Sequence, residues 1–252
     1  MNNLLISIIL TYYKKEMYIH DTIKSILNQT HENFEILIVN DELSDESFKI
    51  LEKISKIDNR IKVLNNKKNI GAGPSRNFAI NFCNGKYIAF CDCDDLWKLN
   101  KLERQLQFME KYNQEFSFTD YEIINDNNLK VDFREAKNSL NFTKLRNSCD
   151  IGLSSVMLRK SLFDNKEFRF GEIKTKEDFV LWLILAKNGV NLSALNECLV
   201  SWRKSSNSLS SSTIQKLIDG FRVYKNYLHY GYFKSFYFLM VLSANYMLKK
   251  FR

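Results

Sequence analysis

Three carboxylates within four residues, Asp92, Asp94 and Asp95 in the segment FCDCDDLW, could do chemistry that few other parts of this sequence could. Like charges so close repel one another unless a cation lies between them. Mg²⁺ and Mn²⁺ prefer oxygen ligands and bridge protein carboxylates to substrate phosphates. In an extended segment Asp92 and Asp94 project to the same side, where one could meet a ribose hydroxyl and the other the metal. The alternative is a solvated acidic turn in which Asp95 caps a helix from Leu96 onward.

A glycine-containing segment, NIGAGPSRN at 69–77, could approach a phosphate. Arg76 stands where the dinucleotide fingerprint GxGxxG has its third glycine, so a dinucleotide-binding loop is excluded. What remains is a loop that enters a helix, with a guanidinium able to form a bidentate pair with a phosphate. A surface arginine at a plain helix N-terminus is the alternative.

The neighbouring acids Glu177 and Asp178 begin the apolar segment EDFVLWLIL. A helix N-terminus favours carboxylates, so a stabilising role at the helix end is one interpretation. The other is a general base that takes the proton of an acceptor hydroxyl. The three histidines lie in no triad or zinc pattern, and the chain has no GxxxxGK[ST] loop, which excludes a P-loop NTPase.

Alternating strands and helices must position these residues. Apolar runs predict buried strands at 4–10, 34–39, 61–64 and 86–90. Helical patterns lie between them, at 16–29, 44–54 and 73–83. This alternation predicts a parallel sheet with helices on both faces.

Ligands of such sheets bind beyond the carboxyl ends of the strands. Polar residues follow all four predicted strands at that end, namely Thr11, Asn40-Asp41, the segment 71–77 and the cluster 92–95. We therefore expect these four loops to meet in a common cleft.

From about residue 113 the alternation stops. FSFTDYEII and LKVDF predict a hairpin around NDNN, SSVMLRK and LSALNECLVSWR predict further strands, and KEDFVLWLILAKNG predicts a helix that ends at Gly189. We expect two closely packed halves of one α/β unit, 1–112 and 113–212, followed by a helical segment, 213–252.

Length and composition fit one large α/β unit: the chain has 252 residues, of which 45% are apolar. Its 37 basic and 29 acidic residues leave a net charge of +8, which suits phosphorylated ligands, nucleic acid or an anionic membrane. No RNA-binding signature is present, so no nucleic-acid partner is expected. Five irregularly spaced cysteines indicate reduced thiols in a cytoplasmic protein, and the N-terminus reads as a first strand, without the features of a signal peptide.

The C-terminal segment is rich in aromatic residues. Its uncharged part, Phe236 to Leu248, has 13 residues. As a helix it would extend about 20 Å, less than the ~30 Å of bilayer hydrocarbon, so it is not expected to span a membrane. Aromatic residues flanked by lysines favour a helix in the membrane interface, which predicts peripheral contact at the inner face of the cell membrane. An ordinary helix packed on the rest of the protein is the alternative.

Together the motifs resemble glycosyltransferase family 2. The resemblance runs over roughly residues 5–212 and rests on five motifs in family order: SIILTYYKKEMYIHDTIKSILNQTHENFEILIVNDELSDES, NIGAGPSRN, YIAFCDCDDLW, KEDFVLWLIL and WRKSSNSLSSS. It implies a GT-A fold, with a Rossmann-like nucleotide-binding half at 1–112 and an acceptor-binding half at 113–212. It also implies inverting transfer from a nucleotide-diphospho-sugar, with UDP as the family's commonest nucleotide, assisted by Mn²⁺ or Mg²⁺. The acceptor would be a saccharide or lipid-linked saccharide of a bacterial surface glycan such as capsule or lipopolysaccharide.

The resemblance also implies roles for residues on the donor side. Thr11 and Asp41 would hold the nucleobase, and Arg76 would lie by the nucleotide. Asp92 and Asp94 would form the DxD pair of the donor and metal site, with Asp95 a further metal ligand.

On the acceptor side, Asp178 would be the base and Glu177 its neighbour. Arg203 and the run Ser205–Ser210 would close over the diphosphate. The sequence departs from the family motifs at Leu10, Asn40, Trp202 and Ser205, which replace proline, an acid, tyrosine and histidine. A nucleotidyltransferase and a non-catalytic nucleotide-sugar-binding protein are the alternatives. The first would need a glycine-rich basic loop after the first strand, where TYYKKE has no glycine.

Overall fold

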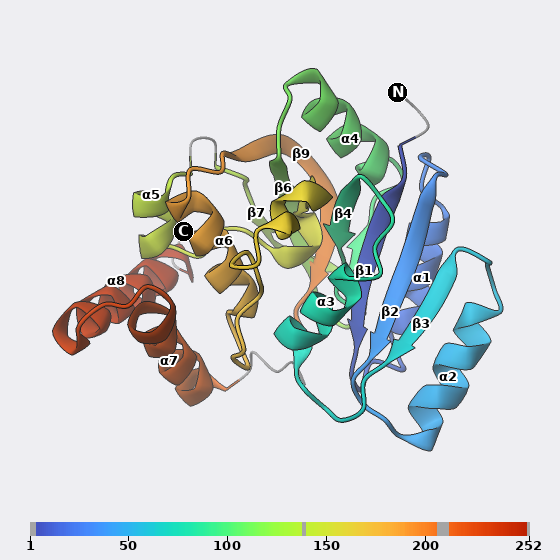
Figure 1. Ribbon diagram of the computed structural model, residues 1–252, viewed down its shortest axis with the longest axis horizontal. Helices are drawn as coiled ribbons and strands as arrows, with labels where there is room; N and C mark the ends of the chain where they lie inside the picture. Colours follow the sequence, from blue (N-terminus) through green and yellow to red (C-terminus); the bar gives the residue numbers. More distant parts are fainter. Residues whose placement is uncertain (1–3, 138–139, 206–211, 251–252) are drawn as a thin grey trace.

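The computed structural model describes residues 4–137, 140–205 and 212–250. Its first half alternates strands and helices as predicted (Figure 1): β1 (Ile6–Tyr12), α1 (Ile19–Leu27), β2 (Phe34–Asn40), α2 (Asp45–Ser55), β3 (Ile61–Asn65), α3 (Ala72–Ile80) and β4 (Tyr87–Phe90). Ser44 caps α2 by accepting a hydrogen bond from the backbone N–H of Ser47.

The next elements, β5 (Leu96–Trp97) and α4 (Lys101–Lys111), still lie within residues 1–112. The second half adds strands of both directions to the same sheet: β6 (Phe116–Ile124), β7 (Lys130–Arg134), α5 (Phe142–Asn147), β8 (Met157–Arg159), α6 (Glu177–Lys187) and β9 (Leu192–Arg203). The predicted hairpin is present as the antiparallel pair β6 and β7. Residues 192–203 form one long strand. A helix capped by Asp95 is wrong, because Leu96 and Trp97 pair with β9 as a strand.

The described strands form one sheet in the order β3-β2-β1-β4-β8-β6-β9-β5, with β7 paired to β6. The first four are parallel, and β8 joins them antiparallel to β4. The last residues of β1, β2 and β3 are in register, since Tyr12 pairs with Asn40 and Asn40 with Asn65. The loops that follow these strands therefore start from one edge of the sheet.

Both faces of the sheet are covered, as predicted. Alternate side chains of a strand point to opposite faces. Ile8 and Leu10 of β1 pack in a core with α1, α2 and α4, while Ile9 packs in a second core with α3 and α6.

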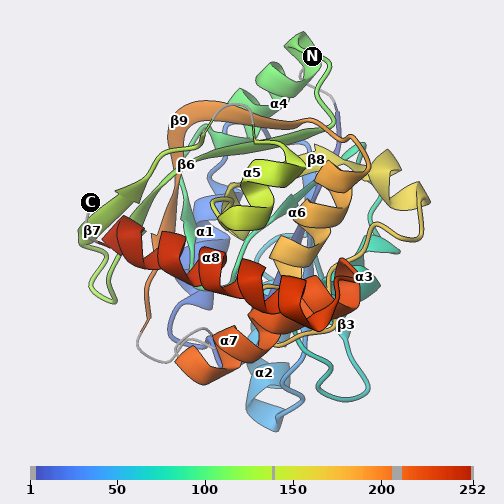
Figure 2. The same cartoon turned by 90° about the vertical axis from the view of Figure 1, so that its left-hand side faces the viewer.

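The C-terminal segment consists of α7 (Thr213–Arg222), a π-helical turn η4 (Val223–Tyr227) and α8 (Tyr232–Lys250). Figure 2 shows α8 lying across α5 and α6, with α7 beneath it. Tyr224, Leu239 and Leu242 belong to the same hydrophobic core as Trp182 of α6. One side of this segment is thus part of the main core. None of the described helices is both long enough and apolar enough to cross a membrane.

Candidate active site

Asp41 follows β2 and fixes the loop that leads into α3. Its carboxylate accepts hydrogen bonds from the backbone N–H groups of Ile70 and Gly71, each at 2.8 Å, and from the Asn66 amide, also at 2.8 Å. Thr11 lies in the adjacent strand β1, one residue before its end, and is partly exposed. Both residues predicted to hold the nucleobase lie at the carboxyl edge of the parallel strands, as expected. The carboxylate oxygens of Asp41 accept hydrogen bonds from the loop before α3 and fix its shape.

Arg76 joins two carboxylates that are far apart in the sequence. Its guanidinium donates to Asp92 at 2.8 Å and to Glu177 at 2.6 Å, and it lies over the Phe170 ring. The Arg76 side chain is only 4% exposed. Burial acts to lower the pKa of Arg76, but the charges of Asp92 and Glu177 outweigh it and hold the pKa above its usual value. The guanidinium therefore organises the site, and both of its ends are already occupied by carboxylates.

Close packing of α3 against residues 170–171 makes this bridge possible. A Cβ on Gly73 would lie 2.3 Å from the carbonyl oxygen of Gly171, so no other residue fits there without a shift. The Asn77 side chain donates to the carbonyl of Phe170 and accepts from its N–H, at 3.0 and 2.9 Å. These contacts place Arg76 within reach of Glu177.

The three carboxylates of the acidic cluster differ in burial: Asp92 is partly exposed, Asp94 is largely buried and Asp95 is fully buried. Asp94 forms an ion pair with Lys15, whose Nζ lies 2.5 Å from Oδ2. Asp95 is fully buried and accepts from the Ser154 hydroxyl at 2.5 Å and from the Arg203 N–H at 2.8 Å. Asp95 therefore ties β9 to the acidic segment.

These surroundings suit a metal ion bound jointly with a ligand. Mg²⁺ is commonly held by one or two carboxylates plus substrate phosphates. Asp92 and Asp94 fit that arrangement, whereas both oxygens of Asp95 have other partners, which disfavours Asp95 as a ligand. In the part of the chain that the structure describes, no three acidic, histidine or cysteine side chains gather as a complete protein-only metal site.

Arg203 holds the β6–β7 turn against the acidic segment. Its guanidinium donates to the carbonyls of Asp94 and Asn125 and to the Asn128 side chain, and it lies 4.7 Å from the centre of the Tyr18 ring. It was predicted to close over a diphosphate, yet its donors here have protein partners. Of the predicted run Ser205–Ser210, all but Ser205 lies outside the described residues.

Glu177 and Asp178 begin α6 after Lys176, which has a left-handed backbone with φ of 67°. Glu177 is held by Arg76, and Asp178 is partly buried beside it. Burial, followed by the nearby charge of Glu177, raises the pKa of Asp178 to about 7, although Arg76 acts to lower it. A carboxylate with a pKa near neutrality is well suited to general base catalysis.

Asp219 of α7 anchors the segment that precedes these acids. One of its oxygens accepts from both the N–H and the hydroxyl of Thr175, each at 3.0 Å, and Asp219 is fully buried. Sequence reasoning missed Asp219 and also Lys15. Asp219 shares α7 with the charged residues Lys216 and Arg222, so its charge alone gave no signal, and nothing local distinguishes Lys15 from Lys14.

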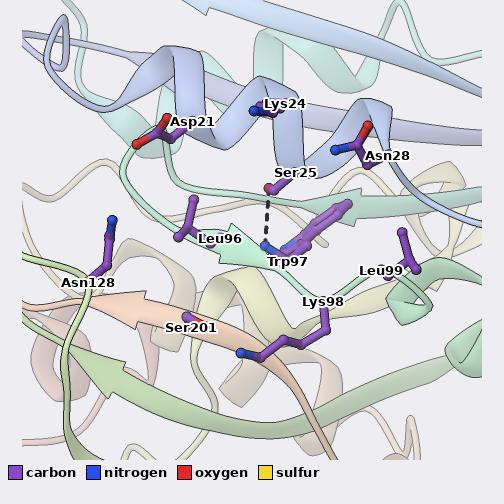
Figure 3. Close-up of a pocket in the computed structure, with 10 residues that line it drawn as sticks. All are labelled: Asp21, Lys24, Ser25, Asn28, Leu96, Trp97, Lys98, Leu99, Asn128 and Ser201. Atoms are coloured by element: carbon purple, nitrogen blue, oxygen red, sulfur yellow. Dashed lines mark hydrogen bonds between the residues drawn. The ribbon is translucent and has the colours of Figure 1, made fainter.

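A separate groove of about 470 Å³ runs between α1 and β5 (Figure 3). It is lined by Asp21, Lys24, Ser25, Asn28, Leu96, Trp97, Lys98, Leu99, Asn128 and Ser201. The backbone N–H of Trp97 donates to the Ser25 hydroxyl at 3.2 Å, which joins β5 to α1. None of the residues assigned to the site from the sequence lines this groove.

Solved structures share this architecture and define it as a GT-A fold. S. aureus TarS, solved in complex with UDP-GlcNAc, superimposes with a TM-score of 0.70 at 20% identity, over 94% of this chain and 70% of TarS. A mannosyltransferase from Pyrobaculum calidifontis, in complex with GDP-Man and Mn²⁺, superimposes with a TM-score of 0.67 at 10% identity, over 91% of this chain and 65% of that one.

Sequence comparison then assigns the family. The model for "Glycosyl transferase family 2" matches residues 7–166. TuaG of Bacillus subtilis, a glycosyltransferase assigned to teichuronic acid biosynthesis, is 34% identical over 98% of this chain and 97% of its own. WfgD of Escherichia coli, a UDP-Glc:α-D-GlcNAc-diphosphoundecaprenol β-1,3-glucosyltransferase, is 39% identical over 86% of this chain and 84% of its own. The chain belongs to glycosyltransferase family 2, as its motifs predicted, and is a sugar transferase, not a nucleotidyltransferase.

Proposed function

We propose that this glycosyltransferase moves a sugar from a UDP-sugar to a hydroxyl of a polyprenyl-diphosphate-linked saccharide, with inversion, during synthesis of a bacterial surface glycan. One observation carries the proposal: the Arg76 guanidinium contacts both Asp92, on the predicted donor side, and Glu177, next to the predicted base. A carboxylate predicted to bind the sugar donor and a carboxylate next to the predicted base thus contact the same arginine side chain. The similarity to WfgD, and to WfaP of the same stated activity at 32% identity, supports this donor and acceptor class.

The reaction follows from these positions. Asp178 accepts the proton of the acceptor hydroxyl, whose oxygen forms a bond to the anomeric carbon as the bond from that carbon to the UDP oxygen breaks. A single displacement from the opposite face inverts the anomeric centre. Asp92 and Asp94 would hold Mn²⁺ or Mg²⁺, which when bound would offset the charge of the leaving diphosphate.

The exposed side of the C-terminal helices supports contact with a membrane surface. Both α7 and α8 carry exposed apolar side chains: Ile214, Leu217, Ile218, Phe233, Phe236, Tyr237 and Met240. We refer to these residues as the apolar face. Basic residues lie among them in the sequence, at Lys216, Arg222, Lys225 and Lys234. This combination suits an anionic bilayer and would bring the site to a lipid-linked acceptor at the inner face of the cell membrane.

The proposal is tested in two steps. UDP-glucose, UDP-GlcNAc, UDP-galactose and GDP-mannose are first screened for thermal stabilisation of the protein, with and without Mn²⁺. The stabilising donor is then incubated with a synthetic GlcNAc-diphospho-lipid, and transfer is followed by mass spectrometry for wild type, Asp94→Asn and Asp178→Asn.

We expect a UDP-sugar to stabilise the protein, with Mn²⁺ increasing the effect. Both variants should lose transfer, and only Asp94→Asn should also lose the Mn²⁺-dependent stabilisation. Binding without transfer to any saccharide acceptor would indicate a non-catalytic binding protein. Stabilisation by GDP-mannose alone would overturn the UDP assignment.

A further inference from the structure

Lys15 is a cation at the acidic cluster that the family motifs do not assign. It lies in the loop between β1 and α1, and its Nζ contacts Asp94 at 2.5 Å and the Ser205 hydroxyl at 3.5 Å. The side chains of Lys15 and Asp94 are 21% and 11% exposed. A lysine thus occupies the carboxylate at which a divalent cation would bind.

Lys15 is less firmly held by protein partners than the other two cationic side chains at this site, Arg76 and Arg203. Arg76 is held between Asp92 and Glu177, and the guanidinium of Arg203 donates to three backbone carbonyls and to a side-chain oxygen. Lys15 has a flexible four-carbon stem and a compact charge. Among the cations at this site, within the ranges that the structure describes, Lys15 is therefore the one able to change partners.

Binding of a divalent cation would force such a change. An ammonium and a divalent ion on the same carboxylate oxygen repel each other strongly, since Coulomb energy grows as the distance falls. Lys15 must then leave Asp94. The anion that arrives with the metal is the diphosphate of the donor, and its charged oxygens are strong acceptors for an ammonium.

The position of Ser205 fits this movement. Ser205 stands where the family motif has histidine, so any phosphate contact from that histidine, and its positive charge when protonated, are missing after β9. Lys15 already reaches the Ser205 hydroxyl at 3.5 Å, and the serine side chain is smaller than the histidine of the family motif.

We propose that Lys15 serves as an exchangeable counter-cation: it neutralises Asp94 in the free protein and transfers to the donor diphosphate when Mn²⁺ or Mg²⁺ binds. Lys15 is then a nucleoside-diphosphate-binding residue of this chain. The inference rests on the proposed function, because it assumes a nucleoside-diphosphate donor.

The exchange predicts opposite effects of one substitution on two ligands. Lys15→Met keeps most of the side-chain length and removes the charge. In the absence of nucleotide, the Lys15→Met variant should bind Mn²⁺ several-fold more tightly than wild type. The affinity is obtained from the concentration of unbound Mn²⁺, measured by electron paramagnetic resonance. With saturating Mn²⁺ the variant should bind UDP about tenfold more weakly by calorimetry, because a charge-assisted hydrogen bond is lost. Lys14→Met, an equal charge change at the exposed neighbouring residue, should leave both affinities near wild type.

The two signs separate exchange from other roles of Lys15. If Lys15 only shapes the loop, Lys15→Met weakens both ligands, and that result overturns the proposal. Unchanged Mn²⁺ affinity, or unchanged UDP affinity, overturns it as well. Wild type that binds Mn²⁺ but no nucleotide at all would instead count against the proposed function, so the two failures can be told apart.

Discussion

At the scale of single residues, the site depends on how burial and neighbouring charges set the properties of a few carboxylates. Asp178 lies beside Glu177, and both lie near Arg76. Asp95 has the same side chain as Asp94 but is fully buried with two protein donors, and therefore has a different role. The role of each aspartate in this cluster therefore depends on its burial and on the donors around it.

The pKa of Asp178, raised to about 7, leads to a prediction for the pH dependence of transfer. A general base must be unprotonated, so kcat should fall about tenfold per pH unit below ~7 and level off above it. Glu177→Gln removes a charge that raises this pKa and should move the inflection to lower pH. Initial rates between pH 5 and 9 measure both. An inflection at the same pH in wild type and Glu177→Gln would contradict the assignment of Asp178 as base.

Thermal unfolding supplies the matched control for Asp178→Asn. The folded state binds the Asp178 proton more tightly than the unfolded state, whose pKa is about 4. The contribution of this group to the free energy of unfolding therefore falls as pH rises from ~4 to ~7. Asp178→Asn should lose transfer without a lower Tm at pH 8. A marked loss of Tm would attribute the lost activity to misfolding.

At the scale of elements, three segments distant in sequence meet to hold the acceptor-side acids. The Gly73 contact brings α3 against residue 171, Arg76 connects α3 to the start of α6, and Asp219 connects α7 to Thr175. Helix α7 is thus a support for the start of α6, although it lies outside the motifs of the family.

Asp219→Ala tests that support. It leaves the Thr175 N–H buried without its acceptor, which costs about 1–3 kcal/mol and loosens the segment before Glu177. We expect kcat to fall about tenfold while UDP affinity stays near wild type, because the donor side is held by the β1–β4 loops. Asp219→Asn retains an acceptor oxygen and should recover part of the loss. Equal losses of UDP affinity and kcat would mean that Asp219 supports the whole fold.

At the scale of the whole molecule, the C-terminal helices have two sides with different environments. The inner side contributes Tyr224, Leu239 and Leu242 to the main core, and the outer side carries the apolar face. Deletion of this segment would remove core residues as well as the exposed ones. Substitutions confined to the outer side are therefore the sharper test of membrane contact.

We expect replacement of Phe233, Phe236 and Met240 by serine to reduce sedimentation with phosphatidylglycerol-containing vesicles by at least about tenfold, since each exposed apolar side chain contributes to interfacial binding. The exposed fraction of Phe233 is the largest of the three, at 95%. The control replaces three exposed apolar residues of the β6–β7 hairpin, Leu129, Val131 and Phe133. It should sediment as wild type does. Equal sedimentation of both triple variants and wild type would contradict the proposed contact.

The sequence alone determined the features that depend on local patterns. Periodicity predicted the strands and helices of the first half and the helix at Glu177, and the motifs predicted the family and its GT-A fold. These predictions are correct because they depend only on residue types within short stretches, such as the apolar run at residues 34–39 and the acidic cluster at Asp92. The assigned roles of individual site residues remain predictions.

Only the tertiary structure decided which charges meet. The partners of Asp94, Thr175 and Arg76 lie 79, 44 and 101 residues away in the chain, at Lys15, Asp219 and Glu177. A single sequence holds no sign of such pairs, because each arises from how the sheet orders its strands and how helices pack across it. The same packing decided that Asp95 is internal and that one side of the C-terminal helices belongs to the core.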